Sequence, residues 1–124
     1  MKIVVFGPER RAGALVGDRV VDLNRGMARY LRERGESNAE NRADARLPAR
    51  LLSLIERGPA GVVDAQAVIG YFSKLSASDD RSDPRVVYNV ADVKLHAPWP
   101  ERRIACVGGN YAAHLAGMWA NRLG

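Results

Sequence analysis

The residues best suited to chemistry in this sequence lie together in one segment, residues 104–114. Their order predicts a short strand over 103–107, a glycine-rich turn and then a helix. A helix that starts directly after such a turn points its unpaired backbone N–H groups toward a bound anion. His114 lies about one helical turn into that helix, and an imidazole exchanges protons near neutral pH. A carboxylate or enolate held at the turn would lie within reach of His114, which makes His114 the candidate catalytic residue. The substrate-binding candidates are Gly108, Gly109, Asn110 and Tyr111.

Taken alone, this pattern also occurs in proteins that have no such function. A two-glycine turn before a helix is found in many folds, and its spacing here is neither that of a Rossmann motif nor that of a P-loop. A lone histidine on a helix is more often a surface or hydrogen-bonded core residue than a catalytic one. Residue spacing by itself predicts only a soluble α+β domain of unassigned function.

Other side chains that could bind metals or form covalent links are few. Cys106 is the only cysteine, which excludes an internal disulfide and agrees with a reducing compartment. Together with His96 and His114 it does not supply the four ligands of a zinc cage. No apolar run approaches the roughly 18 residues that cross a bilayer, and the opening apolar stretch is too short for a signal peptide. The sequence predicts a cytoplasmic protein with no membrane partner.

The net charge of +5 and the isoelectric point near 9.9 raise the question of nucleic acid binding. The basic residues are mostly arginine, and they are scattered among Asp and Glu rather than gathered in one block. Nucleic acid binders usually add a recognisable module or aromatic side chains to a basic face. Neither is present in the sequence, so we expect no nucleic acid partner.

The first 92 residues are predicted to form an N-terminal α+β domain that precedes the motif. Residues 2–6 alternate like a strand, and two apolar runs flank Gly17 and Asp18, a pair suited to a hairpin turn. These features predict a three-stranded antiparallel meander over the first 23 residues. Asn24 is expected to cap a helix that ends before Gly35.

The remainder of this domain is expected to be mainly helical. Residues 36–46 are so polar that they predict a solvated loop or an irregular helical turn. A helix from Pro48 to Gly58 and another over 62–75 follow, the latter with an apolar stripe that includes Val62. After a linker at 76–85, short strands are predicted at 86–88 and 93–95, and two prolines then force an extended path.

Two blocks of the sequence resemble the start of the catalytic domain in the fumarylacetoacetate hydrolase family, whose pattern is L-x-x-P-x-P followed by K-I-x-C-V-G-x-N-Y-x-x-H-x-x-E. The first block is Leu95-His96-Ala97-Pro98-Trp99-Pro100. The second is Arg103-Ile104-Ala105-Cys106-Val107-Gly108-Gly109-Asn110-Tyr111-Ala112-Ala113-His114. The resemblance is close after residue 93 and looser before it, where the hairpin is similar to the N-terminal extension of bacterial members. It implies that residues 93–124 are the first strand and helix of an incomplete, β-rich catalytic domain.

The resemblance also implies a reaction. Family members hydrolyse, decarboxylate or isomerise small β-dicarbonyl acids, using Mg²⁺, Mn²⁺ or Ca²⁺ held by three carboxylates. The histidine that matches His114 activates a water or moves a proton, and a glutamate three residues later commonly assists it. A Lewis acid beside a positioned base is suited to cleaving a carbon–carbon bond next to a carbonyl.

Two differences from the family pattern bear on activity. The position of the assisting glutamate is Gly117 here, and the family's metal-binding carboxylates match no residue of this sequence. We therefore expect an N-terminal fragment with no metal site or cofactor of its own, inactive alone. Its expected partners are a small dicarbonyl acid in the full-length protein and either a second copy or the missing catalytic half. The alternative is a non-catalytic interaction module whose Arg-rich surface binds an acidic partner.

Overall fold

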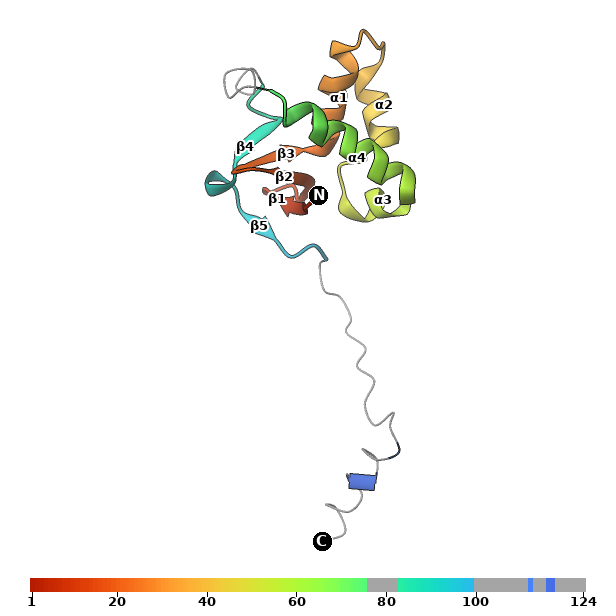
Figure 1. Cartoon of the computed structure of the whole chain (residues 1–124), viewed down its shortest axis with the longest axis vertical. Helices are drawn as coiled ribbons and strands as arrows, with labels where there is room; N and C mark the ends of the chain where they lie inside the picture. Colours follow the sequence, from red (N-terminus) through yellow and green to blue (C-terminus); the bar gives the residue numbers. More distant parts are fainter. Residues whose placement is uncertain (76–82, 100–111, 113–115, 118–124) are drawn as a thin grey trace.

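Three antiparallel strands begin the fold of this computed structural model, which describes residues 1–75, 83–99, 112 and 116–117. β1 (Ile3–Phe6) pairs with β2 (Arg11–Val16), which pairs with β3 (Arg19–Asp22) (Figure 1). Gly17, between β2 and β3, has a φ of 62°, the left-handed conformation that a tight hairpin turn requires. The predicted meander is confirmed.

Two short strands from later in the chain complete the sheet. β4 (Val87–Asn89) pairs with β3, and β5 (Leu95–His96) pairs with β1, so the strand order is β4-β3-β2-β1-β5. A 3₁₀ turn, η1 (Val90–Asp92), lies between them in the chain. This curled antiparallel sheet and the helices beside it confirm the α+β class. β5 lies beyond the predicted boundary at residue 92, and the division into two domains stays a prediction.

The first helix, α1 (Leu23–Glu33), begins at a different cap from the one predicted. Asp22, rather than Asn24, is the N-cap, because its Oδ1 accepts a hydrogen bond of 2.9 Å from the backbone N–H of Arg25. The helix ends where expected, since Gly35 has a φ of 77°. The N-cap prediction was wrong because Asn24 uses its side-chain amide in contacts with a later segment.

The polar stretch after α1 forms a regular helix, α2 (Ala39–Arg46), where a loop or irregular turn was expected. Only two small residues, Ala39 and Ala43, are buried on its inner face. Its charged side chains are held by ion pairs, such as Arg46 with Asp64 at 2.5 Å. The prediction was wrong because so narrow an apolar stripe gives almost no periodic signal.

The last two helices, α3 (Leu51–Glu56) and α4 (Gly58–Phe72), follow each other closely. α4 starts earlier than predicted, with its proline in the first turn, where a missing N–H costs nothing. Val62 was expected on the buried stripe of this helix but is 45% exposed. The residues that α4 buries are Gly61, Asp64, Ala65, Val68 and Phe72.

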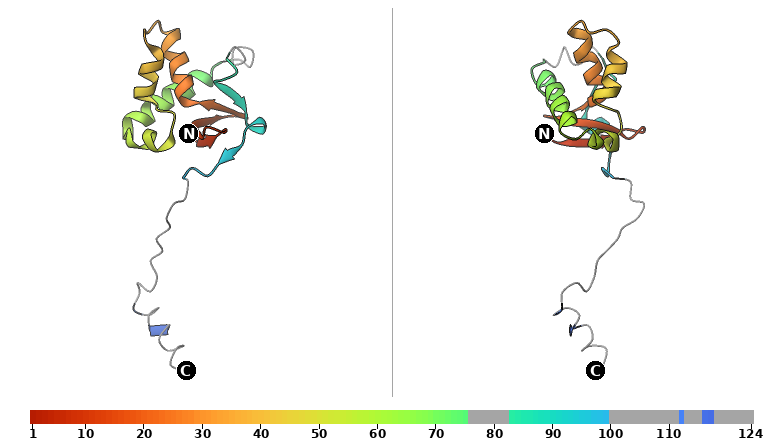
Figure 2. Two further views of the ribbon diagram at one scale, coloured as in Figure 1. Left: turned by 180° about the vertical axis from the view of Figure 1, so that it is seen from behind. Right: turned by 90° about the vertical axis from the view of Figure 1, so that its right-hand side faces the viewer.

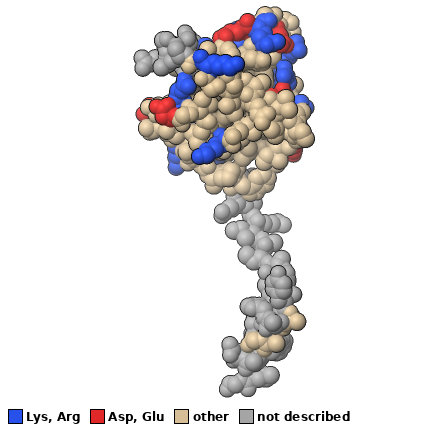
Figure 3. All heavy atoms as spheres, in the orientation of Figure 1, with Lys and Arg blue, Asp and Glu red and all other residues tan. Residues whose placement is uncertain are grey.

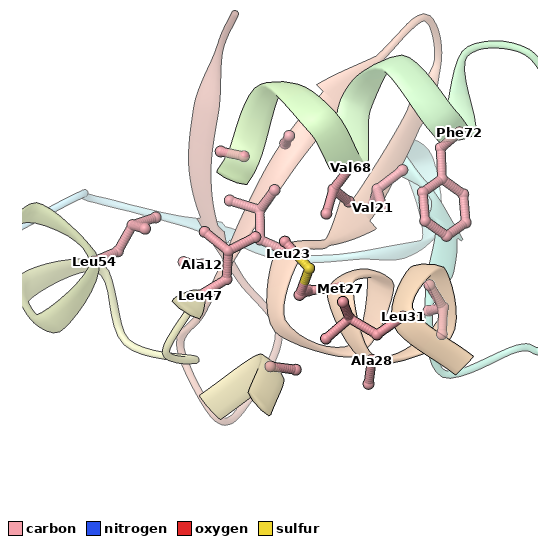
Figure 4. Packing of buried hydrophobic residues seen from close by; sticks show 14 of the residues in the cluster. Ala12, Val21, Leu23, Met27, Ala28, Leu31, Leu47, Leu54, Val68 and Phe72 are labelled. Atoms are coloured by element: carbon pink, nitrogen blue, oxygen red, sulfur yellow. The ribbon is translucent and has the colours of Figure 1, made fainter. Parts of the chain in front are cut away.

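The helices lie together against one side of the curled sheet (Figures 1 and 2). The core between them joins Val21 of the sheet, Met27 and Leu31 of α1, and Val68 and Phe72 of α4 (Figure 4). These side chains are almost fully buried. Because a fully buried large apolar side chain contributes about 2–3 kcal/mol, this cluster is the main source of the fold's stability.

The α1–α4 contact depends on a glycine. A Cβ added at Gly26 would lie 3.0 Å from Cγ1 of Val68 and 3.1 Å from the ring of Phe72. The absent side chain thus lets the two helices approach closely.

The second predicted unit is described only in part. The predicted strand at 103–107 and the turn after it lie outside the described residues, and of the helix that follows only 112 and 116–117 are described, in helical conformation. Among the described residues, no helix has the length and hydrophobicity needed to cross a membrane.

Candidate functional site

None of the residues predicted to act on a substrate is among those that the structure describes. His114, Gly108, Gly109, Asn110 and Tyr111 all fall outside the described residues. Their assignment therefore stays a prediction based on sequence.

Two of the described residues bear on the predicted motif. His96 lies on β5, and its Nε2 is 2.8 Å from the carbonyl oxygen of Gly7, so its ring is engaged with the backbone of the sheet. Gly117 is helical, and a Cβ added there would contact nothing within 4 Å. A glutamate could therefore occupy the helper position without a steric clash.

No metal site is present in the part of the chain that the structure describes. Within it, no three His, Cys, Asp or Glu side chains lie close enough together to hold an ion. Mg²⁺, Mn²⁺ and Ca²⁺ prefer several oxygen ligands, and the described carboxylates are instead spread over different elements. The described residues thus do not fit the family's metal, and no chemical step on this chain is derived through one.

The described residues form an apolar groove of about 250 Å³ between the N-terminus, α3 and α4. We call it the α3–α4 groove. It is lined by Met1, Ile3, Leu51, Leu54, Ile55, Gly58, Gly61, Val62 and Ala65. Three of its apolar side chains are strongly exposed: Met1 at 61%, Ile55 at 57% and Val62 at 45%. All the side chains that line the groove are apolar or absent, so it is suited to an apolar contact.

Several charged side chains lie next to the α3–α4 groove residues in the chain. Arg50, Glu56 and Arg57 are exposed and form no ion pair with any described residue. The arginines in ion pairs are Arg11, Arg25, Arg29, Arg32, Arg42, Arg46 and Arg85. Many of the described arginines are thus paired within the chain, whereas Arg50, Glu56 and Arg57 remain available to a partner, as do Lys2 and Arg10.

A buried polar network lies where β2, β3 and α1 meet. Asp22 is fully buried, and its Oδ2 accepts a hydrogen bond of 2.5 Å from Nε of Arg11. Nη2 of Arg11 also donates to Oδ1 of Asp22 at 3.2 Å and to Oδ1 of Asn24 at 3.1 Å. The hydrogen bond with Asp22 raises the pKa of Arg11. Because each charged group has a direct partner within the chain, this network holds the elements together and leaves no free base.

A second polar cluster connects α1 to α4. Oε1 of Glu33 accepts a hydrogen bond of 2.9 Å from Nε of Arg29, and Oε2 accepts one from the hydroxyl of Tyr71. The hydrogen bond from Tyr71 is the largest cause of a lowered pKa at Glu33, and the hydrogen bond from Arg29 lowers that pKa further. Burial and the hydrogen bond to Glu33 raise the pKa of Tyr71, so its hydroxyl stays protonated at neutral pH. The cluster therefore provides a contact between helices and not a nucleophile.

Replacing Tyr71 with phenylalanine should raise the folded-state pKa of Glu33, because it removes the largest cause of the lowering. A carboxyl group with a lowered folded pKa stabilises the fold above its unfolded pKa, and this stabilisation is lost as the pH falls through the folded pKa. In Tyr71→Phe this stabilisation should be smaller, and its loss should be complete at a higher pH. An NMR titration of the Glu33 carboxyl carbon measures the shift.

Tyr30→Phe is the matched control for this titration. The Tyr30 ring also packs on Tyr71, at 5.6 Å between centroids, but its hydroxyl is hydrogen-bonded by Arg34 and not by Glu33. The Glu33 pKa should not move in that variant. An equal shift in both variants would show that ring packing, rather than the Tyr71 hydroxyl, sets the pKa.

The groove was missed at the sequence level. The sequence predicted a helix from Pro48 to Gly58, but no groove beside it. The available signal was that α3 carries apolar residues at four of its six positions, more than one buried face of so short a helix can use. The sequence could not show that Met1 and Ile3 line the groove, because this depends on how the start of the chain packs beside α3.

Comparison with known proteins adds no family assignment to these observations: no family model matches the sequence, and no curated protein is significantly similar to it.

Proposed function

We propose that this chain supplies the N-terminal domain and the histidine-bearing motif of an enzyme of the fumarylacetoacetate hydrolase type. The reaction class would be hydrolysis, decarboxylation or isomerisation of a small β-dicarbonyl acid. The observation that carries this proposal is the order and spacing of two sequence blocks, residues 95–100 and 103–114. Their glycine turn and histidine are the residue types that anion binding and proton transfer need.

In this proposal, each part of the motif has a distinct role. The backbone N–H groups of the 108–111 turn would bind the anionic end of the substrate, and His114 would move the proton or activate the water. The described fold supports the arrangement in one respect. β5 ends at His96 on the edge of the sheet, next to β1, so the motif follows shortly after a well-anchored strand.

The carboxylates for a divalent metal would come from outside these 124 residues. No Asp or Glu follows Glu101 in the sequence, and the described residues contain no cluster of metal ligands. When bound, the metal would supply Lewis-acid stabilisation of the substrate's negative charge. We therefore propose that the 124-residue chain is inactive by itself.

A chimera tests this proposal. Residues 1–124 would replace the matching N-terminal segment of an active family member that retains its own metal-binding carboxylates. The chimera is expected to hydrolyse an acylpyruvate with Mg²⁺ or Mn²⁺, because the motif and the carboxylates are reunited. The 124-residue chain alone should show no turnover and no low-micromolar metal binding by calorimetry.

The same family member without any N-terminal segment is the control for the chimera. A chimera that unfolds cooperatively but is no more active than this truncated enzyme would contradict the proposal. Tight Mg²⁺ or Mn²⁺ binding by the 124-residue chain alone would contradict the proposal that the metal-binding carboxylates lie outside these 124 residues.

The second candidate is a non-catalytic interaction module, and the α3–α4 groove favours it. The alternative derived from sequence relied on an Arg-rich surface and an acidic partner. Many described arginines form ion pairs within the chain. An apolar contact is therefore better supported than a charged one as the way in which such a module would bind its partner. A chimera with no activity, together with a specific protein contact through the groove, would favour this candidate.

A further inference from the structure

We propose that the α3–α4 groove is the interface through which two copies of this chain form a two-fold symmetric dimer. Single exposed hydrophobic residues are common on protein surfaces, but a continuous apolar hollow with exposed side chains at its edge indicates a contact site. Here Ile55 and Val62, both strongly exposed, flank a hollow that is lined almost entirely by apolar residues. In Figure 3, the surface over α3, α4 and the N-terminus is largely uncharged, with most charged side chains toward its edges.

The charges at the ends of α3 point to a second copy as the occupant. A two-fold interface must be complementary to itself, because the same patch meets itself in reverse. Arg50 precedes α3 and Glu56 ends it, so the two side chains bracket a helix about 9 Å long. When two α3 helices pack antiparallel, Arg50 of each copy lies beside Glu56 of the other.

The apolar residues of α3 lie between these charges. Leu52 is 48% exposed and Ile55 is 57% exposed, and they are three residues apart on the same side of the helix. In the antiparallel arrangement they meet their counterparts at the centre, and each copy can fill part of the other's groove. The result is an apolar centre with ion pairs at its rim, the usual arrangement of protein interfaces.

Glu56 differs from the other described glutamates in having no ion-pair partner among the described residues, although the exposed Asp18, Asp44 and Asp92 have none there either. Each of the carboxylates Glu9, Glu33, Glu36 and Glu40 has an arginine partner within the chain. Glu56 and Arg50 have no ion-pair partner among the described residues, although both are exposed beside the groove. A second copy would supply a partner to both at once.

Sedimentation velocity on the full 124-residue chain, from about 1 to 300 μM, tests the dimer. An interface of modest size predicts a monomer–dimer equilibrium in the micromolar range. Val62→Glu should weaken it at least tenfold, because it places a charge against the apolar side chains that line the groove. Leu95→Glu is the matched control: Leu95 is 44% exposed against 45% for Val62, but it lies on β5, away from the groove.

Charge reversal separates a specific two-fold contact from general hydrophobic association. Glu56→Arg should weaken the dimer, because it places two positive charges together at each end of the interface. Adding Arg50→Glu to the same chain restores opposite charges, so the double variant should recover most of the affinity. Circular dichroism establishes that every variant keeps its helical content.

Three outcomes would overturn the dimer. They are a chain that stays monomeric over the whole concentration range, equal weakening by Val62→Glu and Leu95→Glu, and a double charge variant no stronger than Glu56→Arg. A monomer would also result if another part of the same chain covered the groove, and it would count against the proposal in the same way. None of these measurements uses activity, so their failure is distinct from failure of the proposed enzymatic function.

Discussion

In the chimera with a full set of catalytic carboxylates, His114→Ala should lower turnover by about a hundredfold or more. Removing a general acid or base usually costs a factor of 10² to 10⁴, because the proton transfer must then use water. The sequence predicts that His114 lies one helical turn after the glycine turn, which in the proposed function is near the anionic end of the substrate. Metal binding by the chimera should be unaffected, since the histidine is not expected to be a ligand. Steady-state kinetics and metal calorimetry on the same samples check both parts.

His96→Ala is the control for this experiment, and the structure shows what it should change. Nε2 of His96 is 2.8 Å from the carbonyl oxygen of Gly7, so the substitution removes a contact between β5 and the turn after β1. We expect a loss of about 1 kcal/mol in the free energy of unfolding. Turnover, measured well below the unfolding temperature, should stay near that of the parent. Loss of activity in His96→Ala, or full activity in both variants, would show that the motif does not have the assigned role.

The second large effect should come from Asp22→Ala, which we expect to lower the free energy of unfolding by about 3–5 kcal/mol. Asp22 is fully buried, accepts hydrogen bonds from Arg11 and caps α1 through the backbone N–H of Arg25. Its removal leaves the largely buried Arg11 guanidinium without its carboxylate and α1 without its cap. Because small domains are stable by only about 5–15 kcal/mol, this is a large share of the total. Urea unfolding followed by circular dichroism measures it.

Asp44→Ala is the matched control for Asp22. Asp44 is exposed, and its Oδ1 accepts a hydrogen bond of 2.8 Å from the side-chain amide of Asn24, at the edge of the same network. An exposed hydrogen bond of this kind contributes about 1 kcal/mol or less. Similar losses in the two variants would mean that burial of Asp22 is not what makes its ion pair important.

The meander was predictable because its signals are local. Alternating Ile and Val residues define β1, and the Gly17–Asp18 pair defines the hairpin between β2 and β3, so neither depends on distant parts of the chain. The end of α1 was likewise marked by Gly35, whose left-handed φ a glycine adopts at no steric cost.

The features that could not be predicted depend on tertiary contacts. Asn24 and Asp22 both suit an N-cap, and only the approach of Asp44 and Leu47 shows why Asn24 has a different role. The helix α2 buries only two alanines, and these stabilise it only because α1 lies against it. The groove brings together three segments of the chain, so no single stretch of sequence contains its signal. The predicted site at 108–114 has no described geometry against which to compare it.

The lengths of the strands have a consequence for aggregation. The outermost strands of the described sheet, β4 and β5, are three and two residues long, whereas β2 in the middle has six. An exposed edge strand is a template on which another chain can add by hydrogen bonding, and its hazard grows with its length. The longest hydrogen-bonding strand is thus flanked on both sides by its own chain. Partial unfolding that released β5 would expose β1, and we expect fibril formation by this domain to begin from that edge.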